Sequence, residues 1–227
     1  MSILNVGLPG QGTETIATPR TIFRGDPILL SGFWIIEGAK ARDPGNTPVT
    51  ALRAGMLMGE VTSGGMMAPS IIGVTTVALT AIATTLTIGV AESVELERRQ
   101  GASGTFNLTG PPSAAGTVVT QVITYSAINT TTGVVTIIAS GTAFIAGSFV
   151  QPTDGSQTIK TVLPGDYPIR VVDQDGTSMN VEFGRYPVGG KVFSSMIVNW
   201  PTDTSQRAWI VTALNAVGQY IFDHEHN

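Results

Sequence analysis

The chain has 227 residues, with twelve cationic and sixteen acidic side chains, a net charge of −4 and no cysteine. Phosphate binding needs a dense Lys/Arg surface, which a chain with no cationic cluster beyond one Arg-Arg pair does not supply, so we expect no nucleic-acid partner. The absence of cysteine excludes disulfides, thiolate catalysis and Cys-ligated metals. With 42% hydrophobic and 12% charged residues, 27 Gly and 13 Pro, the composition predicts a folded, turn-rich protein stabilised by burial or assembly.

The first 26 residues contain glycines and prolines among small polar side chains, and their apolar residues are too sparse for a periodic face. We therefore expect residues 1–26 to form an extended arm that is mobile alone and ordered by a partner. No basic region precedes an apolar core here, so we do not expect a signal peptide.

From Pro27 the sequence becomes apolar. The run ILLSGFWII, residues 28–36, predicts the first buried strands, and the loop RDPGNTP, residues 42–48, separates them from the next strand.

Residues 71–90 are twenty positions without a charge, which is long enough for a membrane span. Six threonines and two glycines interrupt this run and no aromatic belt flanks it, so we favour a pair of β-strands and a soluble protein without a membrane partner.

The middle of the chain is free of charge between Arg99 and Asp154. Residues 117–139, TVVTQVITYSAINTTTGVVTIIA, consist of two β-branched runs around an Asn-Thr-Thr-Thr-Gly cluster, which predicts a β-hairpin. Shorter strands are predicted at 105–109 and 133–137. The alternating segment SVELERRQ, residues 93–100, predicts a half-exposed strand.

Two segments, residues 54–64 and 146–155, resemble each other. Each reads Ala-Gly, a short apolar strand, then Thr and a glycine turn, and few charges lie between them. This pattern predicts an outer β domain of residues 27–73 plus 145–227, interrupted by an inserted β module at 74–144. The alternative is coincidence, because Ala-Gly before a strand is common in β proteins.

The C-terminal part is predicted to contain a hairpin at 167–184 that turns at Asp175-Gly176, a strand at 191–199 and one helix. Asp203 can cap that helix, with Gln206 reaching back as in a capping box. Its apolar face comprises Ile210, Val211, Leu214 and Val217, and Gly218 ends it.

Candidate catalytic groups are few. Asp154, Asp166, Asp173 and Asp175 lie near one another along the chain, and a carboxylate pair could serve a glycosidase, but three of them adjoin glycine, which favours turn formation. Both histidines lie in the C-terminal segment 224–226, where a frayed tail is favoured over a metal site and a Ser-His-Asp unit in the core is not expected. We therefore expect no enzyme, no metal and no cofactor.

Three short motifs also have structural explanations. Arg24-Gly25-Asp26 spells the integrin-binding tripeptide, but the adjacent proline indicates the start of a strand. Asn107 and Asn129 begin glycosylation sequons, which we interpret as parts of Thr-rich strands and turns. The glycine-rich residues 7–12 lack the Gly-Lys-Ser/Thr ending of a phosphate-binding loop.

Three stretches, residues 52–74, 149–176 and 186–200, each contain one characteristic element. In chain order these elements are a Leu-Arg-Ala-Gly-x-x-x-Gly start, an Asp154-Gly155-Ser156 turn and a Gly189-Gly190 turn. In these features the chain resembles the head decoration proteins of tailed bacteriophages, the family of the lambda head decoration protein, over roughly residues 27–73 and 145–222. The module at 74–144 departs from the short lambda-type chain and resembles the Thr-rich β inserts of phage virion proteins.

The resemblance implies an all-β fold: a β-tulip or barrel-like decoration domain with one short C-terminal helix, interrupted by an inserted β-sandwich-like module. It implies a homotrimer, made in the host cytoplasm, that binds the major capsid protein at three-fold sites on the outer surface of the virion. The arm would add strands to capsid-protein edges, and linked arms of a trimer need only modest individual affinity. The candidate contact residues of the arm are Ile3, Leu4, Val6, Leu8, Ile16, Ile22 and Phe23.

A second function class remains open, namely a carbohydrate-binding or adhesive β module of a phage fibre or bacterial surface. In that case the inserted module would contact a glycan or a host surface. Sugar-binding faces usually present exposed Trp or Tyr, whereas residues 74–144 contain no Trp and only Tyr125, which favours decoration.

Overall fold

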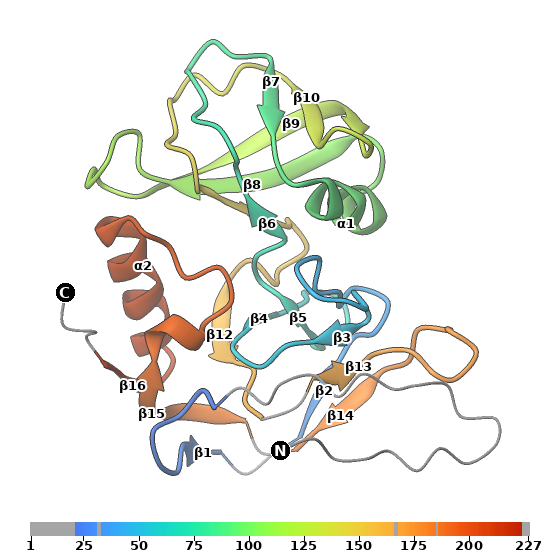
Figure 1. Ribbon diagram of the computed structural model, residues 1–227, viewed down its shortest axis with the longest axis vertical. Helices are drawn as coiled ribbons and strands as arrows, with labels where there is room; N and C mark the ends of the chain where they lie inside the picture. Colours follow the sequence, from blue (N-terminus) through green and yellow to red (C-terminus); the bar gives the residue numbers. More distant parts are fainter. Residues whose placement is uncertain (1–20, 31–32, 166–167, 185, 224–227) are drawn as a thin grey trace, which may run out of the picture.

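The computed structural model describes residues 21–30, 33–165, 168–184 and 186–223. Within these ranges the chain is mostly β-strand, so the prediction of an all-β protein with a short C-terminal helix is confirmed. Two lobes are stacked along the long axis of the molecule (Figure 1). We call residues 72–150 the insert lobe and the remaining described residues the base lobe.

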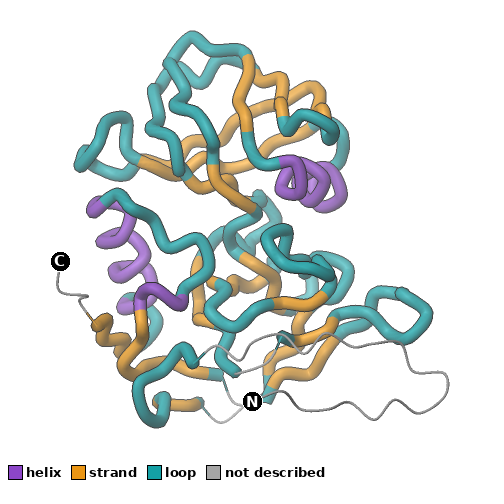
Figure 2. The backbone as a smooth tube through the Cα atoms, viewed as in Figure 1, coloured by secondary structure: helices purple, strands orange, loops and turns teal. Residues whose placement is uncertain are grey.

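The base lobe contains three small sheets. The first has the strand order β12 (Ile159–Val162), β4 (Leu57–Glu60), β5 (Met67–Pro69), β2 (Trp34–Ile36) and β14 (Val181–Phe183). The second has the order β1 (Ile28–Leu29), β15 (Pro187–Phe193) and β16 (Gln219–Asp223). The third pairs β13 (Ile169–Arg170) with β3 (Ala51–Leu52). Helix α2 (Thr204–Asn215) runs beside these sheets and approaches the insert lobe, as Figure 2 shows in purple.

The insert lobe is built on one six-stranded sheet. Its order is β6 (Gly73–Val74), β11 (Phe149–Gln151), β8 (Gly104–Gly110), β9 (Val119–Asn129), β10 (Val134–Ile137) and β7 (Thr85–Thr87). Helix α1 (Val90–Gln100) lies at the side of this sheet that faces the base lobe (Figure 1).

Each lobe has its own hydrophobic core, and strand β11 contributes to both. The insert core draws its buried residues from Ile72 to Val150, whereas Phe149 belongs to a base core. The side chains of successive strand residues point to opposite faces, so β11 forms a shared wall. The sheet of the insert lobe thus extends to residues just outside the predicted limits of 74 and 144. Thr75 exchanges backbone hydrogen bonds with Gly147 and Ser148 at 2.7 and 2.9 Å, which brings the two connecting segments together.

The strand predicted at 93–100 is wrong, because these residues form most of α1. The alternation of Val94 and Leu96 with glutamates fits a two-residue period, but only Leu96 of the two apolar side chains is buried. Glu92 in the first turn and two arginines in the last turn complement the helix dipole, and Glu95 and Arg98 form an ion pair three residues apart. These charge placements outweigh a short alternating pattern.

Two further strand predictions need correction. Among the described residues of the run 28–36, only Ile36 is fully buried, while Ile28 and Phe33 are 50% and 74% exposed. The strand predicted at 191–199 ends at Phe193, where a 3-10 turn, η1 (Ser194–Met196), follows.

The hairpin predicted at 117–139 is confirmed as β9 and β10, which pair antiparallel. The Asn129 side chain accepts hydrogen bonds from the amides of Thr131 and Thr132, and Gly133 has a φ of 73°, as the Asn/Gly cluster predicted. Residues 71–90 contribute β6 and β7, and neither described helix has the length and apolarity needed to cross a bilayer.

The segment 167–184 turns at Asp175-Gly176 as predicted, but its two arms pair elsewhere. Apart from a single bridge between Val172 and Ser178, β13 pairs with β3 and β14 pairs with β2. A hairpin turn therefore joins strands of two different sheets.

Helix α2 begins as predicted, because the Asp203 carboxylate accepts hydrogen bonds from the amides of Ser205 and Gln206. The predicted capping box is wrong, since the Gln206 side chain instead donates to the carbonyl oxygen of Gly147 at 3.0 Å. The helix ends at Asn215, three residues before the glycine predicted to end it.

Candidate interaction surface and charged junction

The aspartates considered for catalysis serve structural roles where they are described. The Asp173 carboxylate accepts hydrogen bonds from the amides of Asp175 and Thr177, and Asp154 is held in an ion pair. Asp166 and the histidine segment 224–226 lie outside the described residues. Within the described ranges, no group of three or more His, Asp or Glu side chains is placed to hold a metal ion.

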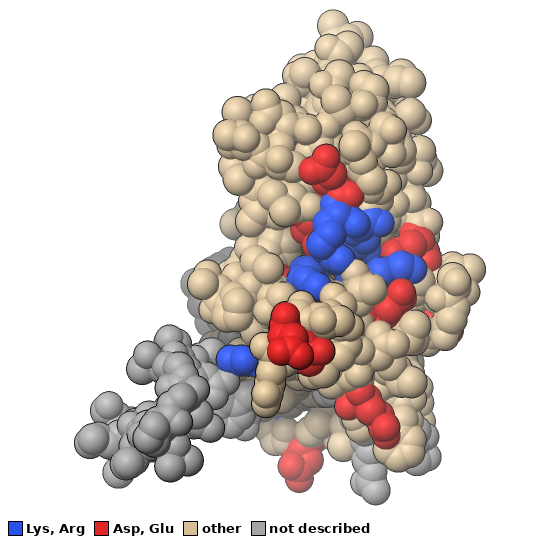
Figure 3. Space-filling view, turned by 90° about the vertical axis from the view of Figure 1, so that its right-hand side faces the viewer, with Lys and Arg blue, Asp and Glu red and all other residues tan. Residues whose placement is uncertain are grey.

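Basic side chains gather at the junction of the lobes, and acidic side chains surround them (Figure 3). On α1, Arg98 pairs with Glu95 at 2.6 Å and also bonds the carbonyl oxygen of Ala39 in the base lobe. The next residue, Arg99, pairs with Asp154 at 3.0 Å. In the base lobe, Arg53 and Asp43 form a third pair, and Lys40 and Glu37 a fourth, at 2.6 and 3.6 Å. Of these contacts, the Arg99–Asp154 pair and the bond from Arg98 to Ala39 join the two lobes, whereas the other three ion pairs lie within one lobe.

Arg99 is the centre of this charged junction. Its side chain is fully buried and donates to the Asp154 carboxylate, to the Ser156 hydroxyl and to the Pro69 carbonyl oxygen. Burial alone would raise the pKa of the Asp154 carboxyl, but the charge of Arg99 and hydrogen bonds from Ser156 and Arg99 outweigh it and hold that pKa below its usual value. The turn Asp154-Gly155-Ser156 is therefore present as predicted and binds α1.

An exposed apolar strip occupies the start of the base lobe. Each of its side chains is 41% to 74% exposed. The strip consists of Ile28, Leu29, Leu30, Phe33 and Ile35. These residues lie on or next to β1 and β2, which belong to different sheets of the base lobe. The sequence pattern predicted burial of these side chains, and their exposure makes them the candidate interaction surface.

Strand β1 is an edge strand. One side pairs with β15, through Ile28 opposite Gly189 and Leu29 opposite Pro187, and among the described residues no strand pairs with the other side. Its free backbone groups can pair with an added strand.

Gly189 and Gly190, predicted as a turn, lie within β15 instead. A Cβ at Gly189 would lie 2.4 Å from the Gln219 carbonyl oxygen, so the glycine permits the close parallel approach of β16.

The predicted contact residues of the arm divide into two groups. Ile22 and Phe23 are only 2% and 8% exposed and belong to a base-lobe core, and backbone hydrogen bonds join Ile22 and Arg24 to β15. Their side chains are used inside the chain, so we leave them out of the candidate surface. Ile3, Leu4, Val6, Leu8 and Ile16 lie outside the described residues.

Comparisons with known proteins identify no relative: no family model, no curated protein and no solved structure matches the chain.

Proposed function

We propose that this chain is a non-enzymatic virion protein that binds, as a homotrimer, to the outer surface of an icosahedral phage capsid and stabilises the head. The observation that carries the proposal is the exposed apolar strip next to the anchored segment 22–24, from which residues 1–20 continue toward the N-terminus. A group of large exposed apolar side chains is typical of a surface that is covered in an assembly.

The geometry also suits attachment by strand addition. The free side of β1 offers backbone donors and acceptors to an edge of the capsid protein, and the exposed Phe33 and Ile35 offer further apolar area. Anchoring of residues 22–24 on β15 fixes where the arm starts. Three arms on one trimer then engage the lattice together, which raises the overall affinity without new contacts.

Co-sedimentation of the full chain with capsids that lack decoration tests the proposal. Replacing Phe33→Ser removes the most exposed member of the strip, and we expect about tenfold weaker binding, the effect of losing one buried aromatic contact. The matched control is Ile82→Ser, because Ile82 is 85% exposed on the insert lobe, and this variant should bind normally.

Two further measurements complete the test. Deleting residues 2–20 should leave the fold intact while greatly reducing capsid binding, because the anchor at 22–24 is retained. Light scattering of the free protein, and imaging of decorated capsids, should give trimers. The proposal would be refuted if Phe33→Ser and the deletion variant both bound capsids as well as the natural chain does. It would also be refuted if the protein were a monomer both in solution and on imaged capsids.

A further inference from the structure

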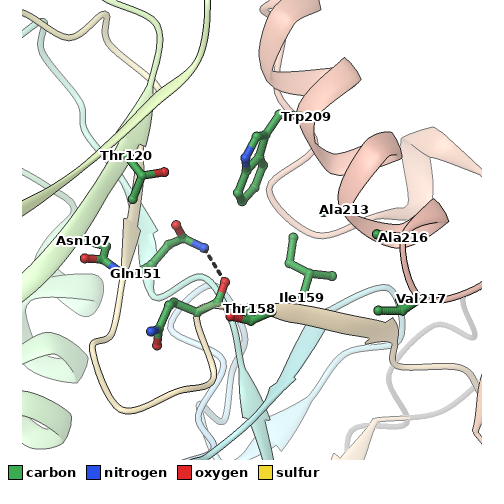
Figure 4. Close-up of a pocket in the computed structure, with 10 residues that line it drawn as sticks. Asn107, Thr120, Gln151, Thr158, Ile159, Trp209, Ala213, Ala216 and Val217 are labelled. Carbon is green, nitrogen blue, oxygen red and sulfur yellow. Dashed lines mark hydrogen bonds between the residues drawn. The ribbon is translucent and has the colours of Figure 1, made fainter.

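A cleft of about 330 Å³ lies between the two lobes, on the side of α2 (Figure 4). Its volume falls at the lower end of the range for small-molecule sites, about 300–1,000 Å³. One wall is the face of the insert sheet turned toward the base lobe and the other is α2, so the cleft exists only because the lobes are held together. No residue of β1 or of the apolar strip lines it.

The sheet wall is polar and uncharged. Asn107 on β8 and Gln151 on β11 are direct neighbours across the antiparallel pair, and Thr120 on β9 lies nearby (Figure 4). Gln151 is fixed: its amide oxygen accepts from the Thr109 hydroxyl at 2.7 Å, and its amide nitrogen donates to the carbonyl oxygens of Gln157 and Ser70 at 3.1 and 3.3 Å. The Thr109 hydroxyl is also hydrogen-bonded to that of Thr120 at 2.8 Å. This wall is therefore rigid before any ligand arrives.

Asn107 is the exception in this network. Its side chain lines the cleft, and no hydrogen bond joins its side-chain amide to the side chain or backbone of another described residue. Buried polar groups in proteins are nearly always hydrogen-bonded, and Asn is disfavoured within β-strands. An amide supplies two donors and an acceptor oxygen, which matches the alternating needs of hydroxyl groups. The Asn107 amide is open to the cleft, so its donors and its acceptor are available to a ligand that occupies it.

The opposite wall presents an aromatic ring. Trp209 on α2 is partly buried, and its indole is held against Phe149 with ring centroids 5.7 Å apart and a 33° tilt. The indole projects from α2 toward the sheet wall (Figure 4), and its N–H has no hydrogen-bond partner among the described residues. Ile159, Ala213 and Val217 continue the apolar surface below it.

We propose that this cleft binds a neutral carbohydrate, with one sugar ring lying on the indole of Trp209 and its hydroxyl groups bonded to the amide of Asn107. A sugar ring has an apolar C–H face and a polar rim, and the cleft offers a matching apolar wall and polar wall. No charged side chain lines the cleft, so an anionic or cationic ligand would lose its hydration without gaining a counter-charge. The site differs from the sugar contact considered from sequence, because its aromatic group comes from the base lobe.

The test is a glycan array that carries neutral, sialylated and sulfated glycans, probed with the full-length chain, followed by calorimetry with the strongest neutral glycan. We expect neutral glycans alone to bind. Trp209→Leu should weaken binding about tenfold or more, while Trp209→Phe, which keeps an aromatic face, should retain most of it. Capsid binding by these variants should be unchanged, so failure here is distinguishable from failure of the proposed function.

Asn107→Val gives a second, independent readout. Valine suits a strand and leaves no unmet polar group, so this variant should unfold at an equal or higher temperature than the natural chain while binding the glycan about tenfold more weakly. A structural role for Asn107 would instead lower the unfolding temperature. Absence of neutral glycan binding, preference for anionic glycans, or binding that survives both Trp209→Leu and Asn107→Val would overturn the proposal.

Discussion

The charged junction offers the sharpest test of how the two lobes are held together, through the substitution Asp154→Asn. Asparagine has nearly the shape of aspartate and can keep the turn contact to the Ser156 amide at 3.2 Å. It removes the charge opposite Arg99, whose side chain is fully buried. Removing one member of a buried ion pair leaves an uncompensated charge, which typically costs about 3–5 kcal/mol.

Because asparagine retains one hydrogen-bond acceptor, we expect a loss near the lower limit, about 3 kcal/mol. For a chain of this size, that corresponds to a fall in unfolding temperature of roughly 6–12 °C. Calorimetry and urea unfolding at pH 7 measure both quantities. The matched control is Asp175→Asn, since Asp175 is exposed in a turn and should change stability by less than about 0.5 kcal/mol.

The same pair predicts a dependence on pH. The pKa of Asp154 is lower in the folded protein than in the unfolded chain, so its stabilising contribution is complete above the ordinary aspartate pKa of about 3.9. The contribution is lost as the pH falls through the lower, folded-state pKa. The stability difference between the natural chain and Asp154→Asn should therefore narrow below about pH 4.

A double variant separates the contribution of the Arg99–Asp154 ion pair from that of the surrounding packing. Arg99→Met combined with Asp154→Asn removes both charges and should recover part of the stability lost in Asp154→Asn alone. If Asp154→Asn unfolds within about 0.5 kcal/mol of the natural chain at pH 7, the guanidinium is solvated or paired elsewhere, and the reasoning about the junction is refuted.

Two other substitutions and one segment replacement test the remaining architecture. Asp203→Ala removes the cap of α2 and should cost about 1 kcal/mol in urea unfolding; an unchanged midpoint would contradict the capping geometry. Gly59→Ala would place a Cβ 2.0 Å from the Ser156 carbonyl oxygen and should lower the unfolding temperature strongly, whereas Gly184→Ala, with no atom within 4 Å, should not. Replacing residues 76–146 with a short Gly/Ser linker should leave a folded but less stable base lobe by circular dichroism, and aggregation would indicate one continuous core.

Local signals in the sequence were sufficient to predict some elements of secondary structure. The turn between β9 and β10 and the start of α2 depend on side chains that bond to their own neighbouring backbone, so Asn129 and Asp203 could be read directly from the sequence. Helix α1 could not be predicted in this way. Its Glu95 side chain is buried and paired with Arg98, and hydrophobic periodicity takes no account of ion pairs.

The surfaces were harder to predict for a different reason. Apolar composition in residues 28–35 indicates that these side chains will be covered, but it does not say whether this chain or another molecule covers them. The cleft was missed because Asn107 and Trp209 are remote in sequence and belong to different lobes. Only the packing of α2 against the insert lobe brings them face to face.

The hydrogen bonds between Thr75 and the segment 147–148 have a consequence for the order of folding. Strands β5 and β12 of the base lobe lie on either side of residues 72–150 in the chain, so the base sheet must close a long loop before it forms. The entropy of closure grows with loop length, although slowly. If the insert lobe folds first, its paired ends remove most of that loop, and we expect the base lobe to form afterwards around a completed insert lobe.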